Sequence, residues 1–202
     1  MESTGSPFDA SVSTSASRLD SRRFATNPGA LYRGTGPARP PSGASEDIMK
    51  IGDKIPDLRG KTGEGDEVRL RDLKGKSIVV YFYPKDSTPG CTLEAQDFRD
   101  LQKDFGKRGA VVLGVSRDSA KSHCNFKQKQ SLNFDLIADT DETWCKAFDV
   151  IHEKTLYGRK FIGVVRSTFL IGPDGRLLHE WRNVKVPGHA DVVLEAVRAS
   201  SK

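Results

Sequence analysis

The sequence contains few cysteines and no long apolar run, and both shortages narrow the possible classes of protein. Three cysteines in 202 residues are too few for a scaffold held by disulfides, so each is expected to be a reduced thiol in a cytoplasmic protein. No stretch approaches 18 consecutive apolar residues, which predicts that no helix spans a membrane. Hydrophobic residues make up only 36% of the chain, so part of it is not expected to join a core.

Motifs for metals, nucleotides and nucleic acids are also missing. Cys91, Cys124 and Cys145 lie far apart, with no C-x-x-C pair and no regular histidine spacing, so we expect no metal site. No glycine-rich phosphate loop or dinucleotide fingerprint occurs, and no bound nucleotide cofactor is expected. The formal net charge is +5, but no block of Lys and Arg stands out, so nucleic-acid binding is not expected either.

Residues 1–48 differ in composition from the rest of the chain. They hold nine serines and five prolines, and their apolar residues follow neither a helical nor an alternating pattern. Five arginines balance five acids there, so the net positive charge belongs to the remainder. Such a segment buries too little apolar surface to offset its chain entropy, and we predict a disordered tail. Two alternatives stay open: a targeting segment, which the five acids disfavour, and a true start at Met49.

Residues 49–202 are predicted to form one α/β domain, with a size sufficient for one core. Strands are expected at 77–83, 110–116 and 134–139, a hairpin at 164–182, and helices at 92–109, 118–131, 141–150 and 189–200, after a short strand or turn at 67–73. This order favours a mixed central sheet with helices on both faces. In the helix 92–109, the side chains of Leu93, Phe98, Leu101 and Phe105 are expected to form the buried stripe.

The stretch "YFYPKDSTPGC" (81–91) places Cys91 just after a buried strand, in the first turn of a helix. Unpaired N–H groups and the positive end of the helix dipole meet there, and both favour a thiolate over a thiol. Pro84, Thr88 and Cys91 form the pattern P-x-x-x-T-x-x-C. The proline can shield the site, and the threonine can hydrogen-bond a sulfur or a bound oxygen. An ordinary strand-to-helix turn, in which Pro, Ser, Thr and Gly are common, is the alternative.

The longer segment "YFYPKDSTPGCTLEAQDFRD" resembles the active-site segment of peroxiredoxins and is similar to that of the PrxQ class, also called bacterioferritin comigratory proteins. The stretches "VLGVSRDS", "LIADTD" and "GVVRSTFLIGPDG" extend the resemblance from about residue 49 to the C-terminus. It implies a thioredoxin-like fold and an antioxidant enzyme that reduces hydrogen peroxide and organic hydroperoxides with a thiolate. The family motif falls on Pro84, Thr88 and Cys91, and the family's distant arginine falls on Arg166, within the expected strand "VVRSTFLI".

The chemistry explains why these residue types are needed. Attack of a Cys91 thiolate on a peroxide oxygen gives a sulfenic acid and water or an alcohol. An unperturbed thiol, with a pKa of about 8.5, is already about 3% thiolate at pH 7, so full ionisation gains about thirtyfold at most. Any larger acceleration requires preorganised donors for the charge that develops on the two oxygens. Arg166, the N–H groups near Gly90 and Cys91, and the Thr88 hydroxyl are the candidates.

The sulfenic acid must then be reduced. In the commonest PrxQ arrangement a second cysteine follows five residues after the first, and here that position is Gln96. Cys124 is the remaining candidate, since some PrxQ-like proteins have their resolving cysteine in this helix, although it falls about one turn before the expected position, near Lys127. A disulfide needs Cα atoms roughly 4.4–6.8 Å apart, so both helices would have to unwind locally. The alternative is a one-cysteine enzyme, and Cys145 is expected to lie in the core.

The resemblance further suggests thioredoxin or glutaredoxin as the reductant and a monomer without a bound cofactor. Two rival functions remain open. A thiol–disulfide oxidoreductase would use "TPGC" as a redox motif, but Thr88 stands where its first cysteine would be. A non-enzymatic redox sensor would dock a partner through the tail, and the tail has no apolar anchor for that role.

Overall fold

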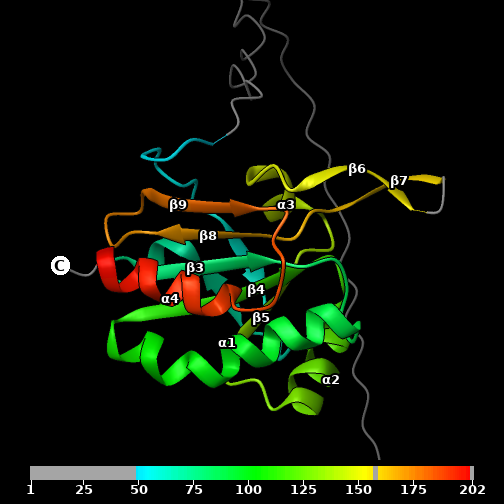
Figure 1. Cartoon of the computed structure of the whole chain (residues 1–202), viewed down its shortest axis with the longest axis horizontal. Coiled ribbons are helices and arrows are strands. Elements are labelled where there is room, and N and C mark those ends of the chain that lie inside the picture. Colours follow the sequence, from blue (N-terminus) through cyan, green and yellow to red (C-terminus); the bar gives the residue numbers. More distant parts are fainter. Residues whose placement is uncertain (1–48, 157–158, 201–202) are drawn as a thin grey trace, which may run out of the picture. The chain divides into compact units, whose positions relative to one another are not determined.

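A five-stranded mixed sheet forms the centre of the computed structural model, which describes residues 49–156 and 159–200 (Figure 1). The strand order is β5-β4-β3-β8-β9: Asp135–Ala138, Ala110–Ser116, Ser77–Phe82, Ser167–Ile171 and Leu177–Arg182. Strands β3, β4 and β5 run parallel, whereas β8 runs antiparallel to both β3 and β9. The predicted α/β architecture with a mixed sheet is confirmed, and the tail predicted at 1–48 lies outside the described residues.

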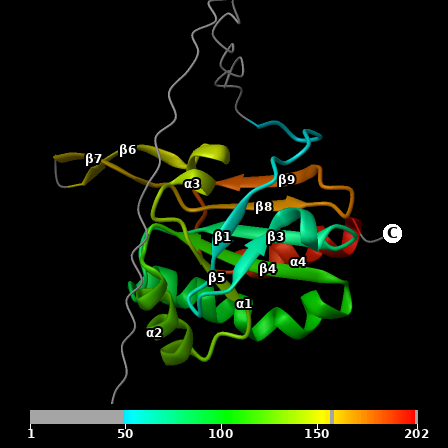
Figure 2. The same ribbon diagram turned by 180° about the vertical axis from the view of Figure 1, so that it is seen from behind.

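Helices cover both faces of this sheet, as predicted. On one face, α1 (Pro89–Lys107) and α4 (His189–Ser200) pack side by side, with α2 (Ala120–Gln130) beside β5 (Figure 1). The 3-10 helix η1 (Leu70–Leu73) and the short helix α3 (Thr143–Ala147) lie on the other face (Figure 2). In the part of the chain that the structure describes, no helix is both long enough and apolar enough to cross a membrane.

Strand β3 separates two hydrophobic clusters and is buried along its whole length. Its alternating side chains divide between them, because successive residues of a strand point to opposite faces. Val79, Tyr81 and the following Tyr83 pack against α1 and α4. Ile78, Val80 and Phe82 face the cluster that contains α3. The loop that follows β3 therefore starts from a rigid base.

The inward stripe of α1 differs from the predicted one at its first residue. Phe98 and Phe105 are buried, but the Leu93 side chain is 43% exposed, so that prediction was wrong. The helix begins at Pro89, earlier than expected, since proline suits the first helical position. At 3.6 residues per turn, the buried line runs through Cys91, Ala95 and Phe98, which turns Leu93 away from the sheet.

Two antiparallel hairpins were not predicted. One joins β1 (Arg59–Lys61) to β2 (Glu67–Arg69), and the other joins β6 (Ile151–Leu156) to β7 (Arg159–Val164). The β6–β7 hairpin extends beyond the central sheet in Figure 1, and its sequence is too polar to show a buried alternation. The hairpin leads directly to Arg166. This residue was expected within a strand, but it lies in the short connection between β7 and β8.

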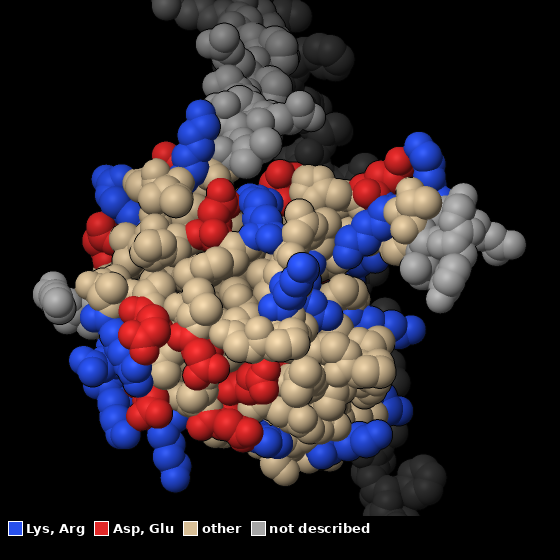
Figure 3. All heavy atoms as spheres, viewed as in Figure 1, with Lys and Arg blue, Asp and Glu red and all other residues tan. Residues whose placement is uncertain are grey.

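Charge is distributed unevenly over the surface. Asp and Glu side chains gather over α1 and α4 in Figure 3; the exposed acids of these helices include Asp100, Asp191 and neighbouring carboxylates. Burial, and then the nearby Asp191 and Asp100, raise the pKa of Asp97. The positive net charge of the chain therefore does not produce a uniformly basic surface.

Candidate active site

The Cys91 thiol lies at the carboxyl end of β3, in the first turn of α1, and is only 1% exposed. Thr88 is extended and caps the helix, and the first helical hydrogen bond runs from the Thr92 N–H to the Thr88 carbonyl at 2.8 Å. The N–H groups of Gly90 and Cys91 precede that bond and have no acceptor within the helix. The predicted placement of Cys91 in the first turn of the helix after this strand is therefore confirmed, and the structure adds that the thiol is buried.

Arg166 supplies a cation directly to this thiol. Its Nη2 donates a hydrogen bond to the Cys91 Sγ at 3.2 Å, across 75 residues of sequence. A Cβ atom added at Gly90 would lie 3.4 Å from the same Nη2, so the turn backbone also lies close to the guanidinium. Arg166 reaches the site because β8, which it precedes, pairs antiparallel with β3 and starts opposite the residue where β3 ends. The fold thus brings Cys91 and Arg166 into contact, as the family resemblance had implied.

Glu94 completes this group and was not identified from the sequence. The Nη1 of Arg166 donates to one carboxylate oxygen of Glu94, which is 1% exposed, while the other oxygen has no hydrogen-bond partner among the described residues. Burial raises the pKa of Glu94 to about 7, against the lowering effect of Arg166. Although burial disfavours the charge of Arg166, Glu94 and Cys91 raise its pKa. The spacing of three residues from Cys91 to Glu94 was the available signal, since it places both on one helix face.

Lys154 on β6 is a second cation near the thiol. Its Nζ donates to the Val164 carbonyl at 2.6 Å, which holds the ammonium beside the segment leading to Arg166. Burial and then the charge of Arg166 lower the pKa of Lys154, whereas Cys91 acts in the opposite direction. Its charge therefore interacts with both the thiol and the guanidinium. Sequence reasoning missed Lys154 because it had not predicted the β6–β7 hairpin.

The two remaining motif residues differ in their surroundings. The hydroxyl of Thr88 donates to the Lys85 carbonyl at 3.0 Å, so its proton is directed toward the backbone. The oxygen can still accept a hydrogen bond, but donation to a sulfur, which was one expectation, does not occur in this state. Pro84 is exposed at the end of β3 and fixes the backbone where the loop begins.

The other two cysteines have separate environments. Cys124 on α2 is half-buried, and its Sγ accepts a hydrogen bond from the Gln128 Nε2 at 3.5 Å. Cys145 is fully buried beside Trp144 in the α3 cluster, as predicted. Burial and the carboxylate of Asp139 raise the Cys145 pKa well above its usual range. All three thiols are free, so the structure joins Cys91 to Arg166 but forms no bond between Cys91 and Cys124.

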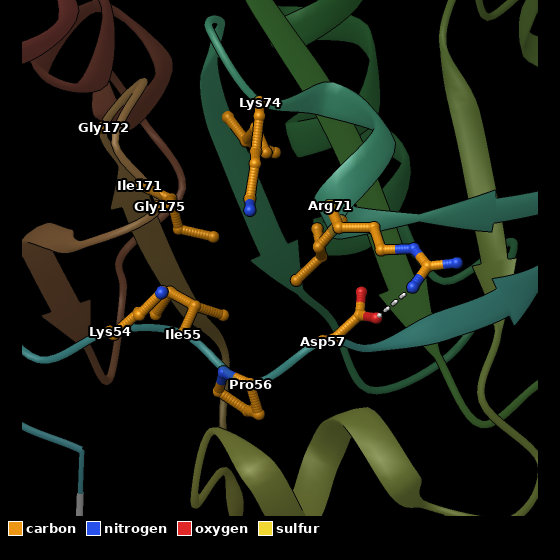
Figure 4. Close-up of a pocket in the computed structure, with 11 residues that line it drawn as sticks. Lys54, Ile55, Pro56, Asp57, Arg71, Lys74, Ile171, Gly172 and Gly175 are labelled. Atoms are coloured by element: carbon orange, nitrogen blue, oxygen red, sulfur yellow. Dashed lines mark ion pairs between the residues drawn. The ribbon is translucent and has the colours of Figure 1, made fainter.

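A separate hollow of about 240 Å³ lies at the amino end of β3, away from Cys91 (Figure 4). Ile78 of β3 and Ile171 of β8 contribute to its lining, and an ion pair of 3.5 Å joins Arg71 to Asp57 beside it. None of the residues predicted for the site lines this hollow. Within the described ranges, no three His, Cys, Asp or Glu side chains are grouped so that they could hold a metal ion.

Comparisons with known proteins agree with this arrangement. The model of the AhpC/TSA family matches residues 51–180. Peroxiredoxin Bcp of Xanthomonas campestris pv. campestris is 53% identical over 146 residues, which cover 72% of this chain and 91% of that protein. Peroxiredoxin Bcp of Bacillus subtilis is 48% identical over 154 residues, which cover 76% of this chain and 98% of that protein.

Solved structures give the same result. The bacterioferritin comigratory protein of Xanthomonas campestris, studied as trapped intermediate and ligand complexes for its alkyl peroxide reduction activity, has 50% identity and a TM-score of 0.72. That match covers 77% of this chain and 99% of the other. A cysteine-to-serine mutant of Xylella fastidiosa PrxQ has 46% identity and a TM-score of 0.73, over 76% of this chain and 98% of the other. The chain therefore belongs to the AhpC/TSA family and, within it, to the Bcp/PrxQ peroxiredoxins, which are thiol peroxidases.

Proposed function

We propose that Cys91 is the peroxidatic nucleophile of this chain and that its substrates are hydrogen peroxide and organic hydroperoxides. The hydrogen bond of 3.2 Å from the Arg166 Nη2 to the Cys91 Sγ carries this proposal, because it sets a cation beside a buried sulfur. The alkyl peroxide reduction activity of the related Xanthomonas campestris protein supports the organic substrate class.

The first step forms a bond from the Cys91 sulfur to the terminal peroxide oxygen and breaks the O–O bond. The products are the Cys91 sulfenic acid and a hydroxide or alkoxide, which takes up a proton to become water or an alcohol. Negative charge moves from the sulfur to the leaving oxygen, so donors that are already oriented lower the barrier. Arg166 and the N–H groups of Gly90 and Cys91 are such donors, and the Thr88 oxygen can accept the hydrogen of the attacked peroxide oxygen.

The burial of Cys91 favours this function over thiol–disulfide exchange. A protein disulfide must bring its own backbone to the attacking sulfur, and Cys91 is 1% exposed in this state. A small peroxide needs much less space, since only its terminal oxygen must reach the sulfur. The same burial makes a surface redox sensor a weaker proposal than a peroxidase.

The second step uses Cys124 as the resolving cysteine. The Cys124 thiol attacks the sulfenic sulfur, a disulfide forms and water leaves; thioredoxin or glutaredoxin then reduces the disulfide through two thiol exchanges. Cys91 and Cys124 are unbonded here, and a disulfide needs Cα atoms roughly 4.4–6.8 Å apart, so this proposal includes a local opening of α1 and α2. We further propose that the enzyme is a monomer that protects the cytoplasm against peroxides.

Intact mass spectrometry tests both steps at once. The reduced protein is treated with one equivalent of hydrogen peroxide, in parallel with Cys91→Ser and Cys124→Ser. We expect wild type to lose two hydrogens and Cys124→Ser to gain one oxygen. Gain of one oxygen in both proteins would make this a one-cysteine enzyme. Oxidation that persists in Cys91→Ser at the wild-type rate would refute the assignment of Cys91.

A further inference from the structure

A buried polar cluster connects the catalytic loop to α2, the helix that carries Cys124. Its centre is the carboxylate of Asp86, which lies two residues after Pro84. The Asp86 side chain is 4% exposed. It accepts hydrogen bonds from the Tyr83 hydroxyl at 2.7 Å and from the Ser122 hydroxyl at 2.7 Å. The Nδ1 of His123, a fully buried residue, lies 2.9 Å from the same carboxylate.

The imidazole of His123 lies between two acceptors. Its Nδ1 faces the Asp86 carboxylate, and its Nε2 faces the Ile137 carbonyl of β5 at 3.2 Å. Each ring nitrogen therefore lies where a bound proton can be donated to a fixed acceptor. Three donors keep Asp86 ionised: although burial acts against it, His123, Ser122 and Tyr83 together lower the pKa of Asp86. Buried polar contacts of Asp86 and His123 thus join the loop, α2 and β5.

A second connection reinforces the first. The backbone N–H of Asp86 donates to an Asp118 carboxylate oxygen at 2.8 Å, and the Ser116 hydroxyl donates to the same oxygen at 2.8 Å. Asp118 lies just before α2, whose cap is Ser119. The loop is therefore attached both to the segment that enters α2 and to the first turn of α2 itself.

From this cluster we infer that Asp86, Ser122 and His123 form a lock that holds α2 closed and sets the rate at which Cys124 can reach an oxidised Cys91. This inference rests on the proposed role of Cys124. Cys124 directly follows His123 in the chain. If Cys124 moves by several ångströms, His123 must move with it and lose its contact with Asp86. Apart from the lock, the first turn of α2 buries no other side chain. The remaining contacts of the helix, made by Phe126, by Lys127 with Asp135 and by Gln130 with Gln96, hold its later turns, so the start of α2 depends on the lock.

The lock makes Asp86 a positioning residue rather than a catalytic one. With the lock closed, Cys124 stays on the helix surface, where Gln128 binds its sulfur, and the Cys91 sulfenic acid remains open to a second peroxide. With the lock released, the disulfide forms sooner. The strength of the lock therefore sets the partition between disulfide and over-oxidation to sulfinic acid, without contributing to the first chemical step.

Ser122→Ala tests this inference with little risk to folding, because it removes one hydroxyl and leaves the contact between His123 and Asp86 in place. We expect roughly tenfold to a hundredfold faster formation of disulfide, the range for one hydrogen bond to a charged group. Hydrogen exchange in α2 should accelerate by a similar factor relative to α1, and the yield of sulfinic acid at high peroxide should fall. His123→Gln, which removes the imidazole contact with Asp86, should act in the same direction and more strongly. Lys121→Ala, at an exposed position of the same helix turn, is the matched control and should change none of the three.

The possible outcomes separate the lock from the role of Cys124. Faster α2 exchange together with faster disulfide formation supports both. If hydrogen exchange in α2 accelerates in the variants while no disulfide forms in wild type or in any variant, the result supports the hold of the lock on α2 and refutes Cys124 as the resolving cysteine. Disulfide formation in wild type with unchanged exchange and rate in Ser122→Ala and His123→Gln overturns the lock and leaves the proposed function intact. A loss of global stability with an unchanged ratio of disulfide to sulfinic acid also overturns it, since that is the effect of a merely structural contact.

Discussion

Cys91 and Cys145 occupy similar positions yet have opposite electrostatic surroundings. Each follows a buried strand and a short loop, lies in the first turn of a helix and is almost fully buried, at 1% and 0% exposure. The guanidinium of Arg166 donates to the Cys91 sulfur, whereas the backbone N–H of Cys145 donates to the Asp139 carboxylate at 2.8 Å. Burial and a helix start therefore do not distinguish Cys91, the proposed nucleophile, from Cys145, whereas the sign of the neighbouring charge does.

The difference shows how the fold selects one thiol. Around Cys145, Asp139 accepts hydrogen bonds from the N–H groups of Trp144 and Cys145. Burial, and then this carboxylate at the start of α3, raise the Cys145 pKa. Around Cys91 the cap residue Thr88 makes no side-chain hydrogen bond to α1, so the N–H groups of the first turn have no acceptor within the helix. A capping carboxylate stabilises a helix but occupies the donors that a thiolate needs, so the start of α1 suits the proposed catalysis and the start of α3 does not.

The largest expected effect comes from removing the selected thiol. Cys91→Ser should lower the rate constant for peroxide reduction by more than about a thousandfold, because a hydroxyl is a far weaker nucleophile than a thiolate. Cys145→Ser should leave the same rate constant within about twofold, since its thiol lies beside a carboxylate. Stopped-flow tryptophan fluorescence or competition with a second peroxidase measures it. Equal losses in the two variants would remove the distinction between these sites.

Arg166 carries the next largest effect. Arg166→Gln should slow the oxidation of Cys91 by about a hundredfold to a thousandfold, the cost of losing one preorganised donor to developing charge. Arg166→Lys should recover only part of this loss, because a single ammonium cannot bond the sulfur and the Glu94 carboxylate as the guanidinium does. Both rates are measured with hydrogen peroxide under pseudo-first-order conditions. If Arg166→Lys reacted as fast as wild type, a positive charge alone would be sufficient for the rate, and the simultaneous contacts of the guanidinium with Cys91 and Glu94 would not be needed.

Glu94 should reveal itself through the pH dependence of stability. Its pKa is raised from 4.5 to about 7 in the folded protein, so its contribution to stability is complete below pH 4.5 and is lost as the pH rises through 7. Glu94→Gln does not titrate, so between pH 4.5 and pH 8 wild type should lose on the order of 2–3 kcal/mol relative to this variant. Urea unfolding at several pH values measures the difference. Stability curves that stay parallel would contradict a buried carboxyl group with a raised pKa.

The smallest effect is expected at the inert thiol. Cys145→Ala should lower the free energy of unfolding by about 1–2 kcal/mol, through the cavity left in the α3 cluster. The rate of peroxide reduction should not change. Urea unfolding and the kinetic assay, performed on the same preparation, test both parts. A stable variant with reduced peroxidase activity would instead connect the α3 cluster to the active site.

Much of this arrangement could be predicted from local sequence. The apolar run 77–83 predicted the buried strand β3, and the turn residues after it predicted a helix start with Cys91 in its first turn. These features depend on neighbours in the chain, since strand burial, proline at a helix start and the exposed N–H groups of a first turn are all local properties. The motif of Pro84, Thr88 and Cys91 is local for the same reason.

The partners of Cys91 were decided by tertiary structure. Glu94 has an ordinary helical spacing, and only the antiparallel pairing of β3 with β8, which brings Arg166 to this end of the sheet, makes it part of the site. Lys154 depends on a hairpin whose polar sequence gives no period. Charge in a buried site is set by residues that are distant in sequence and adjacent in space. The sequence by itself therefore determined which thiol stands at an open helix end, and the pairing of strands determined which charges surround it.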